Sequence, residues 1–414
     1  MANGKCRIAG DNLVECLDLG EQYVTDFVKL GAEKSGETGS LKLGISPQSG
    51  LVQLFDSFPP EKMYRRYWYK SGLNESMRHE LRDVVESAMS YIKLKQGDTV
   101  LDIASNDGTM LSFYPEILNR IGVDPSNVAA ESELYGGKIT LVNDFFSTKT
   151  YRSVTNTRAK IITIIAMFYD IEDPLDFLQQ IREIIDDQGV LIIQLSYTPL
   201  MLDQLEFGNI CHEHVCYYTL DVLKSLLEKT GFEIFDVTLN STNGGSLRVY
   251  ATPQGAIDAL ACPLHWLSIG RARVIGTLEY EKREELRTAG PYLRFMQNIE
   301  KLKRDTLRWL QLQAESGKTV MGYGASTKGN VLLQYYGITT DLIPYIAEAN
   351  HDKWGLCTIG TGIPIISEKE MRAMKPDYLF VFPWFFIKYF MEREKNLLTS
   401  GTRFVMPQPQ LRIV

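Results

Sequence analysis

Two carboxylates follow neighbouring apolar runs in the first half of the chain. The segment VLDIASNDGTML (residues 100–111) leads from an expected strand ending in Asp102, through a loop with Gly108, to a helix that begins near Thr109. A second acid, Asp124, ends the next expected strand. In an α/β sheet, a strand, a tight loop and a helix N-terminus form a site for adenosine-containing ligands, because free N–H groups point into the pocket and glycine lets the backbone approach.

The loop and the second acid indicate which ligand binds there. The loop lacks the GxGxxG spacing of the dinucleotide fingerprint, and Asp124 is well placed to accept hydrogen bonds from a ribose. Together they favour S-adenosylmethionine over NAD. We expect Asn106 in the same loop and Asp144 in NDFF, where adenine N6 is commonly contacted, to complete the cofactor site. A helix N-cap is the open alternative for Asp144.

Alternating strands and helices are expected to position these residues. Five apolar runs of strand length, separated by helical segments, predict a doubly wound, mostly parallel sheet: LDIAS, RIGVDP, KITLVN, IITIIAMF and VLIIQL. Two later runs, EIFDVTL and GSLRVYAT, are joined by a turn around Asn243 and predict an antiparallel pair at the end of that sheet. The predicted fold class is therefore α/β with a Rossmann-like central domain.

The chain divides into a small β-rich module at 1–75, the central domain at 76–255, a helical connection at 256–315 and a C-terminal α/β domain at 316–414. In the last domain, GYGASTKGN follows a strand and opens a helix. Backbone N–H groups around Gly324, with Lys328 nearby, can hold a diphosphate. A purely structural loop, and an NAD site with Glu348 at the end of the next strand, remain open.

Composition excludes several functional classes. The 414 residues are 44% hydrophobic and 23% charged, as in a globular protein of two or three domains, and the net charge of -7 argues against nucleic acid as a partner. No run approaches the roughly 18 apolar residues of a membrane span. The N-terminus lacks the apolar core of a signal peptide, and the six cysteines show no disulfide framework. We expect a cytoplasmic monomer or weak oligomer with reduced thiols and no membrane association.

The motifs, in their order along the chain, resemble the S-adenosylmethionine-dependent sugar C-methyltransferases, which add a branch methyl to nucleotide-linked 4-keto-deoxysugars. The resemblance runs nearly end to end and rests on these segments: KCRIAG, GLVQL, YWYKSG, LDIASNDGT, NDFF, HEHVCYYTL, NGGSLRVY, GYGASTKGN, GIPI, PDYLFVFPW and PQP. It implies an N-terminal zinc-binding module, a Rossmann-like methyltransferase domain, and a C-terminal α/β domain that helps to hold the nucleotide sugar.

The chain departs from this family at the zinc site. The family's site consists of two CxxC pairs, of which only Cys6 remains, while Ala9, Ser46 and Ser49 stand where thiolates are expected. One thiolate and two neutral hydroxyls cannot replace the four soft ligands of a closed zinc site. We therefore expect zinc to be absent.

C-methylation needs a base beside the ketone and a group that stabilises the enolate. The segment HEHV supplies base candidates, and the resemblance puts His214 in that role with Glu213 beside it to orient it. A solvated loop is the open alternative, and a metal site is not expected, because His212 and His214 point to opposite sides and a third ligand is not evident. Tyr67 and Tyr69 can present phenol hydroxyls to the enolate oxygen or the sugar, or can serve only in packing.

The remaining expected substrate contacts lie in NGGSLRVY. Asn243 stands where relatives often have histidine and either contacts the substrate or supplies a residue with positive φ, and Arg248 is a further candidate contact. Two other departures, Ala104 for a glycine and Cys211 for a tyrosine, remove no obvious proton-transfer group. The predicted function is C-methylation of a nucleotide-linked 4-keto-deoxysugar. The alternatives are a non-catalytic ligand-binding homologue and an O- or N-methyltransferase.

Overall fold

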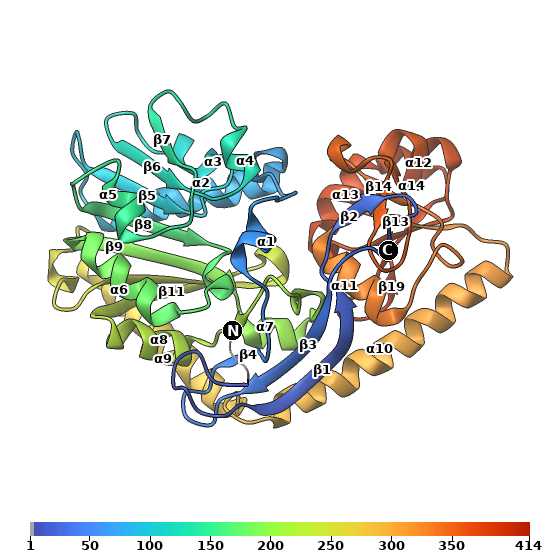
Figure 1. Cartoon of the computed structure of the whole chain (residues 1–414), viewed down its shortest axis with the longest axis horizontal. Helices are drawn as coiled ribbons and strands as arrows, with labels where there is room; N and C mark the ends of the chain where they lie inside the picture. Colours follow the sequence, from blue (N-terminus) through green and yellow to red (C-terminus); the bar gives the residue numbers. More distant parts are fainter. Residues whose placement is uncertain (1–3) are drawn as a thin grey trace.

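The computed structural model describes residues 4–414. Two lobes, the central domain and the C-terminal domain, are bridged below by strands β1 (Val14–Tyr23) and β3 (Thr38–Ile45) and by the long helix α10 (Gly290–Glu315) (Figure 1). In this part of the chain, no helix combines the length and the apolar character that a bilayer crossing requires. The six cysteines are all buried and free.

A seven-stranded sheet with the order β11-β12-β9-β8-β5-β6-β7 forms the central domain. Its strands are β5 (Thr99–Ile103), β6 (Asn119–Val123), β7 (Ile139–Val142), β8 (Ala159–Ile165), β9 (Ile185–Ser196), β11 (Phe232–Asn240) and β12 (Ser246–Pro253). The strands from β5 to β9 pair in parallel, whereas β12 runs antiparallel to both β9 and β11. The predicted doubly wound sheet with an antiparallel end is confirmed.

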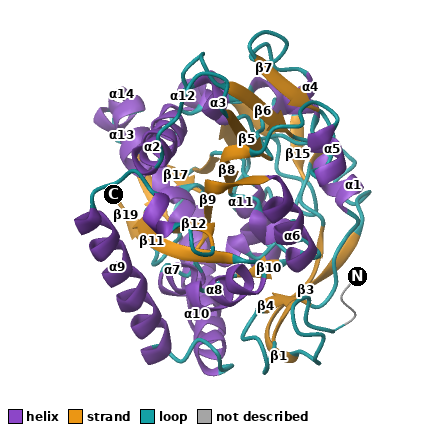
Figure 2. Cartoon of the chain, turned by 90° about the vertical axis from the view of Figure 1, so that its left-hand side faces the viewer, coloured by secondary structure: helices purple, strands orange, loops and turns teal. Residues whose placement is uncertain are grey.

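Helices cover both faces of this sheet, so its central strands are buried on both sides. Figure 2 shows β5, β8 and β9 between α2 (Glu75–Tyr91) and α6 (Pro174–Ile184). Helix α2 is capped by Asn74, whose side chain accepts the Ser76 N–H. The apolar residues of this helix recur every three to four positions along one face. The other helices of this domain are α3 (Thr109–Ser112), α4 (Asn127–Ala130), α5 (Thr148–Arg152), α7 (Thr198–Asp203), α8 (Leu220–Lys229) and α9 (Leu264–Arg283).

The N-terminal module is β-rich, as predicted, but its strands pair with strands of both lobes. Its sheet contains β1, β3, β4 (Val52–Leu54) and the short strand β10 (Cys216–Tyr217), which comes from the HEHVCYY segment of the central domain. Its strand β2 (Phe27–Lys29) pairs instead with β15 (Leu356–Thr358). The aromatic segment MYRRYWYKSG (residues 63–72) begins inside α1 (Pro60–Tyr64). Because strands cross the expected domain boundaries, those boundaries stay predictions.

The C-terminal domain is a second α/β unit, also as predicted. Its sheet contains β13 (Val320–Tyr323), β14 (Ile346–Glu348), β16 (Ile365–Ser367), β17 (Tyr378–Val381), β18 (Arg403–Met406) and β19 (Arg412–Ile413), in the order β16-β14-β13-β17-β18-β19. Only the β18–β19 pair in it is antiparallel. Its helices are α11 (Thr327–Tyr336), α12 (Glu368–Met374), α13 (Ile387–Arg393) and α14 (Lys395–Thr399).

Candidate active site

A cavity of about 940 Å³ lies where the three parts of the molecule meet. Its wall includes the carboxyl ends of β5, β6 and β8, the aromatic segment, the HEHV turn and the glycine loop before α11. Ligand sites in open α/β sheets lie at this edge, where the strand order reverses. Single drug-sized ligands occupy cavities of roughly 300–1,000 Å³, and this cavity is at the upper end of that range.

Asp102 lines the cavity near the carboxyl end of β5. Its side chain is buried and accepts a hydrogen bond from the Thr163 hydroxyl at 2.8 Å. Burial raises the pKa of Asp102 to about 8, and the charge of nearby Asp124 acts in the same direction. A buried acid of this kind is neutral near pH 7 and ionises when a cation binds beside it. Asp102 therefore suits a ligand that carries an ammonium or sulfonium group.

Asp124 is held in one orientation at the end of β6. Its carboxylate accepts the Asn106 N–H at 2.8 Å and both the N–H and the hydroxyl of Ser126, at 2.8 and 2.5 Å. A carboxylate has about four acceptor positions, so one remains for a ligand hydroxyl. Asn106 and Ala104 both have positive φ, of 50° and 59°, which turns the loop sharply around this end of the cavity.

The other two expected cofactor residues lie outside the cavity wall. Gly108 has φ 79°, and a Cβ there would lie 3.0 Å from the Tyr135 ring, so the glycine is required by the turn and by this packing. Asp144 is half-exposed and accepts a hydrogen bond from Arg65 at 3.0 Å. Ser147, not Asp144, is the N-cap of α5, so the alternative interpretation of Asp144 was wrong.

The two phenylalanines that follow Asp144 line the cavity in its place. Phe145 and Phe146 contribute apolar wall, and the Arg65 guanidinium lies 4.9 Å from the Phe145 ring centre. An aromatic face beside the Asp124 carboxylate suits a planar base linked to a ribose. The motif NDFF contains both phenylalanines, but the sequence alone favoured Asp144 as the residue that contacts the cofactor.

His214 presents one ring nitrogen to the cavity. Its Nδ1 lies 2.8 Å from the Asn209 carbonyl oxygen, and its ring packs against Tyr169 with centroids 4.2 Å apart. Because a carbonyl only accepts, Nδ1 carries the proton and Nε2 is left as an acceptor. Burial, with the Lys328 charge as a second cause, lowers the pKa of His214 to about 3. The imidazole is therefore neutral at physiological pH.

The other residues of HEHV have different environments. His212 is buried away from the cavity, where its Nε2 lies 3.0 Å from the Gly39 carbonyl oxygen and its ring packs edge-on against Phe58. Glu213 faces the cavity and accepts a hydrogen bond from the Thr25 hydroxyl at 3.3 Å. Burial raises the pKa of Glu213 to about 7. The Asn209 carbonyl orients His214, and an orienting role for Glu213 stays a prediction.

One group of side chains could share a metal ion within residues 4–414. Ligand atoms of Cys211, Glu213 and His214 all lie within 4.8 Å of one another. Cys211 is thus the third neighbour that the sequence did not reveal. Burial raises the pKa of the Cys211 thiol well above its usual value, and a metal binds the thiolate, so a metal would first have to displace this proton. The absence of a metal stays a prediction.

The two candidate tyrosines line different ends of the cavity. Burial raises the pKa of both phenols. For Tyr67, the second cause is the charge of Glu213. For Tyr69, the second cause is the charge of Asp107, in the loop after β5. The Tyr69 carbonyl also accepts a hydrogen bond from Asn106 at 2.9 Å. Tyr67 therefore belongs with the HEHV turn, whereas Tyr69 belongs with the expected cofactor loop.

The candidate substrate residues of the glycine loop meet Asn243 across the cavity. Lys328 Nζ donates to the Asn243 carbonyl oxygen at 2.8 Å and lies 3.7 Å from Glu206. Asn243 has φ 54°, so it does adopt the left-handed conformation, and it also lines the cavity. Gly324 has φ 82°, and a Cβ there would clash with Pro383 at 2.7 Å. Lys328 thus connects the two lobes at the cavity wall.

The structure removes Arg248 from the expected substrate contacts. This residue lies on β12, and its buried guanidinium binds Gln194 at 2.6 Å, Glu80 at 2.7 Å and Asp83 at 2.8 Å. It is not part of the cavity wall. Its charge is used to hold α2 on the sheet, a role that the motif NGGSLRVY did not reveal, because sheet alternation alone does not say which face is covered.

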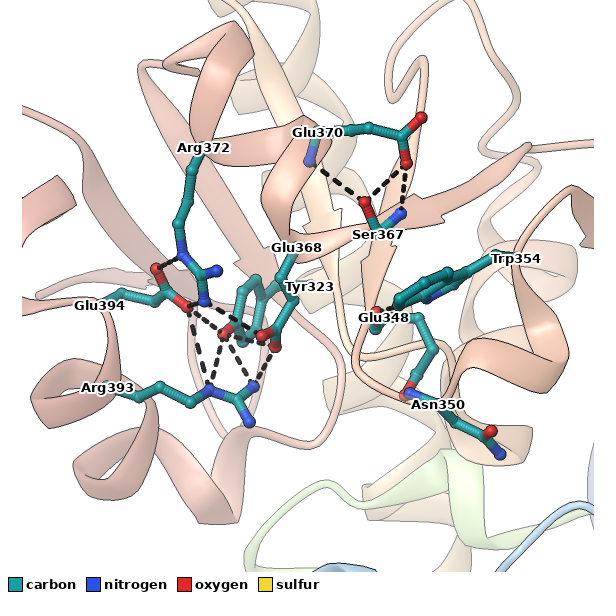
Figure 3. Close-up of polar contacts among 10 residues, drawn as sticks. All are labelled: Tyr323, Glu348, Asn350, Trp354, Ser367, Glu368, Glu370, Arg372, Arg393 and Glu394. Atoms are coloured by element: carbon teal, nitrogen blue, oxygen red, sulfur yellow. Dashed lines mark hydrogen bonds and ion pairs between the residues drawn. The ribbon is translucent and has the colours of Figure 1, made fainter.

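Polar side chains also line the C-terminal end of the cavity (Figure 3). The Tyr323 hydroxyl, at the end of β13, lies 3.0 Å from Glu368 and 2.9 Å from Glu394, and Arg393 donates to it at 2.8 Å. Glu348, at the end of β14, accepts the Asn350 N–H at 2.8 Å. Of this group, the sequence motifs pointed only to Glu348.

The expected positions of the lost zinc ligands do come together in the N-terminal module. Cys6 Sγ lies 3.2 Å from the Ser49 hydroxyl and accepts the Ala9 N–H at 3.4 Å. Ser46 donates to Asp11 at 2.8 Å and accepts the Ser49 N–H at 3.0 Å. These hydrogen bonds join the two loops that four thiolates would otherwise hold through a metal. A zinc-free module stays a prediction.

Both halves of the chain match described protein families. Residues 73–237 match a methyltransferase domain, and residues 241–409 match the C-methyltransferase C-terminal domain. A relative of similar length is C-methyltransferase NovU of Streptomyces niveus. It is 26% identical over 418 residues, which cover 99% of this chain and 96% of NovU.

Solved structures are similar to parts of the chain. A chain of the complex that contains the Haloferax volcanii Trm112 methyltransferase activator has a TM-score of 0.35 and 13% identity, covering 44% of this chain and 94% of that one. The plantazolicin methyltransferase BpumL, solved in complex with a pentazolic desmethylPZN analog and SAH, has a TM-score of 0.35 and 14% identity, covering 44% of this chain and 86% of its own.

Proposed function

Because the chain belongs to the C-methyltransferase family, we propose that it transfers a methyl group from S-adenosylmethionine to a carbon of a nucleotide-linked 4-keto-deoxysugar. The observation that carries the proposal is that one cavity contains both the buried acids at the carboxyl ends of β5 and β6 and a neutral imidazole with a free nitrogen. The acids suit an adenosine ligand, and the imidazole suits proton removal.

The cofactor end of the cavity supports S-adenosylmethionine in particular. When bound, this cofactor supplies an electrophilic methyl group on a positively charged sulfur. Asp102 gains its charge beside such a cation, Asp124 keeps an acceptor position for a ribose hydroxyl, and Phe145 offers a face to the adenine. Asn106 holds this loop against the aromatic segment through its contacts with Ser71 and Tyr69.

The catalytic end supports a carbanion mechanism. Nε2 of His214 removes the proton from the carbon beside the ketone, and the electron pair of the broken C–H bond becomes the enolate. The Tyr67 hydroxyl donates a hydrogen bond to the enolate oxygen. The carbon then attacks the methyl group, and the electrons of the sulfur–methyl bond stay on sulfur. The imidazolium returns its proton to solvent, with Glu213 able to take it up because the pKa of this acid is about 7.

The glycine loop before α11 supports a phosphorylated substrate. The helix N-terminus at Thr327 offers backbone N–H groups, and Lys328 adds a positive charge at the same cavity wall. Gly324 lets this loop pack closely on Pro383, since a Cβ there would lie 2.7 Å from the proline ring. In the proposed complex the diphosphate lies at this loop, and the sugar extends toward His214.

Methyl transfer from a labelled cofactor to a panel of nucleotide-linked 4-keto-deoxysugars tests the proposal. We expect a new carbon–methyl bond, located by NMR, and no transfer with the corresponding 4-hydroxy sugars, because these lack the ketone that acidifies the C–H bond. Label on an oxygen or nitrogen would make the protein a methyltransferase of another kind. Cofactor binding without transfer to any acceptor would favour a non-catalytic ligand-binding homologue.

A further inference from the structure

Asp170 faces the catalytic end of the cavity, although neither the motifs nor the proposed mechanism uses it. It ends a 3₁₀ helix (Phe168–Asp170) that follows β8, the strand beside β5 in the sheet. Asp102 follows β5 at the same edge. A group placed here lies between the expected methyl donor and the HEHV turn, where the reacting carbon must be.

One carboxyl oxygen of Asp170 has no protein partner. Oδ1 is buried and makes no hydrogen bond within residues 4–414, whereas the backbone N–H of Asp170 is bonded to the Met167 carbonyl oxygen at 2.8 Å. The backbone is therefore fixed while the side chain is free to bind. A buried polar atom without a partner costs about 1–3 kcal/mol, so such groups in active sites commonly bind a ligand atom.

The surroundings of Asp170 keep its carboxyl group neutral. The titratable groups whose charges interact with it are Tyr64, Tyr67, Tyr169, Cys211, Glu213 and Tyr217, and no lysine or arginine forms an ion pair with Asp170 or Glu213 in the described part of the chain. Burial, and then the charge of Glu213, raises the pKa of Asp170 well above its usual range. A protonated carboxyl group has one O–H to donate.

The hydrogen bonds of the neighbouring groups indicate what the Asp170 O–H donates to. Tyr64 already donates to the Glu213 carbonyl oxygen at 2.7 Å, and the Glu213 carboxylate accepts from Thr25. His214 keeps a free acceptor, which cannot stabilise negative charge on oxygen. Tyr67 supplies one donor to this part of the cavity. An enolate oxygen is stabilised best by two donors that already point at it.

We propose that Asp170 is a catalytic hydrogen-bond donor, which binds the ketone oxygen of the substrate together with Tyr67 while His214 removes the neighbouring proton. This inference rests on the proposed function. The Asp170 proton stays on its carboxyl oxygen throughout the step, so the only proton transferred is the one that passes from the substrate carbon to His214.

Asp170→Asn and Asp170→Ala separate this role from others. Asparagine keeps a neutral donor at nearly the same place, so hydrogen–deuterium exchange beside the ketone and methyl transfer should both stay within about 10-fold of the parent rates. Alanine removes the donor, so both rates should fall by about 100-fold or more, the usual effect of one lost oxyanion donor. Cofactor binding, measured by calorimetry, and melting temperature should stay close to those of the parent.

Asp173→Asn is the matched control. Asp173 lies three residues further on as the exposed N-cap of α6, asparagine caps a helix as well as aspartate, and we expect parental rates. If Asp170→Ala exchanges at the parental rate, or if Asp170→Asn is as slow as Asp170→Ala, Asp170 is not the donor. A parent protein that methylates no 4-keto sugar would instead overturn the proposed function, and this inference with it.

Discussion

The two ends of the cavity are built in different ways. At the cofactor end, Asp102 lies near the carboxyl end of β5 and Asp124 follows β6, two strands that are neighbours both in sequence and in the sheet. At the catalytic end, Tyr67, Asp170 and His214 come from the aromatic segment, the turn after β8 and the HEHV turn. The cofactor end is therefore a local motif, whereas the catalytic end exists only when distant segments pack together.

The two ends also differ in their electrostatics. Both bury ionisable groups, which raises the pKa of Asp102 to about 8 and that of Glu213 to about 7 and lowers that of His214 to about 3. The Asp102 carboxyl becomes charged when a cation binds beside it, whereas at the catalytic end the His214 imidazole is neutral and Glu213 is about half ionised at pH 7. This difference suits a charged methyl donor at one end and the removal of a proton at the other.

The largest expected effect concerns His214. His214→Asn should keep cofactor binding but lower methyl transfer and exchange beside the ketone by roughly 100-fold or more, because it removes the base. His212→Asn is the matched control, since this ring packs against Phe58 outside the cavity; it should lower the melting temperature more than the exchange rate. The reverse pattern would make His212 the base.

A smaller effect is expected at the cofactor end. Asp124→Ala should weaken S-adenosylmethionine binding by about 10- to 100-fold in calorimetry, the usual range for a lost hydrogen bond to a charged group. Asp144→Ala, which removes a half-exposed acid beside the cavity, should change the affinity less than about threefold. Equal effects of the two substitutions would return Asp144 to the cofactor site, and no effect of Asp124→Ala would remove the ribose role from Asp124.

The pH dependence of stability reports on Glu213. Its folded pKa of about 7 lies above its usual value of 4.5, so the folded state binds this proton more tightly than the unfolded state does. Burial of this acid costs no stability below pH 4.5, and the cost grows as the pH rises toward 7. Glu213→Gln should therefore melt at a temperature increasingly above the parent's between pH 5 and pH 8, with no difference near pH 4. A pH-independent difference would contradict the raised pKa.

The smallest expected effect is that of metal removal. Elemental analysis of the purified protein should find much less than one zinc per chain, and a chelator should leave the melting temperature unchanged, because hydrogen bonds already join Cys6, Ser46 and Ser49. About one tightly bound zinc per chain would contradict this. Cys6→Ser and Cys211→Ser variants would then locate the ion in the N-terminal module or beside His214.

Element types were largely predictable, because they depend on local patterns. The five apolar runs became β5 to β9, and the turn at Asn243 joined an antiparallel pair, since buried parallel strands require unbroken apolar stretches. The pairing of strands between different domains was not predictable. Strand β10 has only two residues, and its pairing with β4 is a contact between segments more than 160 positions apart that no local pattern announces.

The site residues differ in the same way, since some could be predicted from local patterns and others depend on tertiary contacts. The acids after β5 and β6 could be named from the chain, because the residues just after a parallel strand lie at a known edge of the sheet. Asp170 comes after β8 by the same rule, but it lies five positions beyond the end of that strand, and its proposed role depends on its burial near the charge of Glu213, which is distant in sequence. Arg248 shows the opposite error, since a basic residue in a matching motif binds Gln194, Glu80 and Asp83 within the protein.

The sequence by itself determined the α/β fold class, the succession of strands along the chain and the family resemblance, because apolar periodicity and motif order are properties of the chain. Only the tertiary structure decided that His214 faces the cavity while His212 is buried against Phe58, and that Asp170 lines the same cavity as Tyr67 and Glu213. The direction of a side chain in a turn and the pKa of a buried group both depend on which distant residues exclude water from it, and that is settled only when the whole chain has folded.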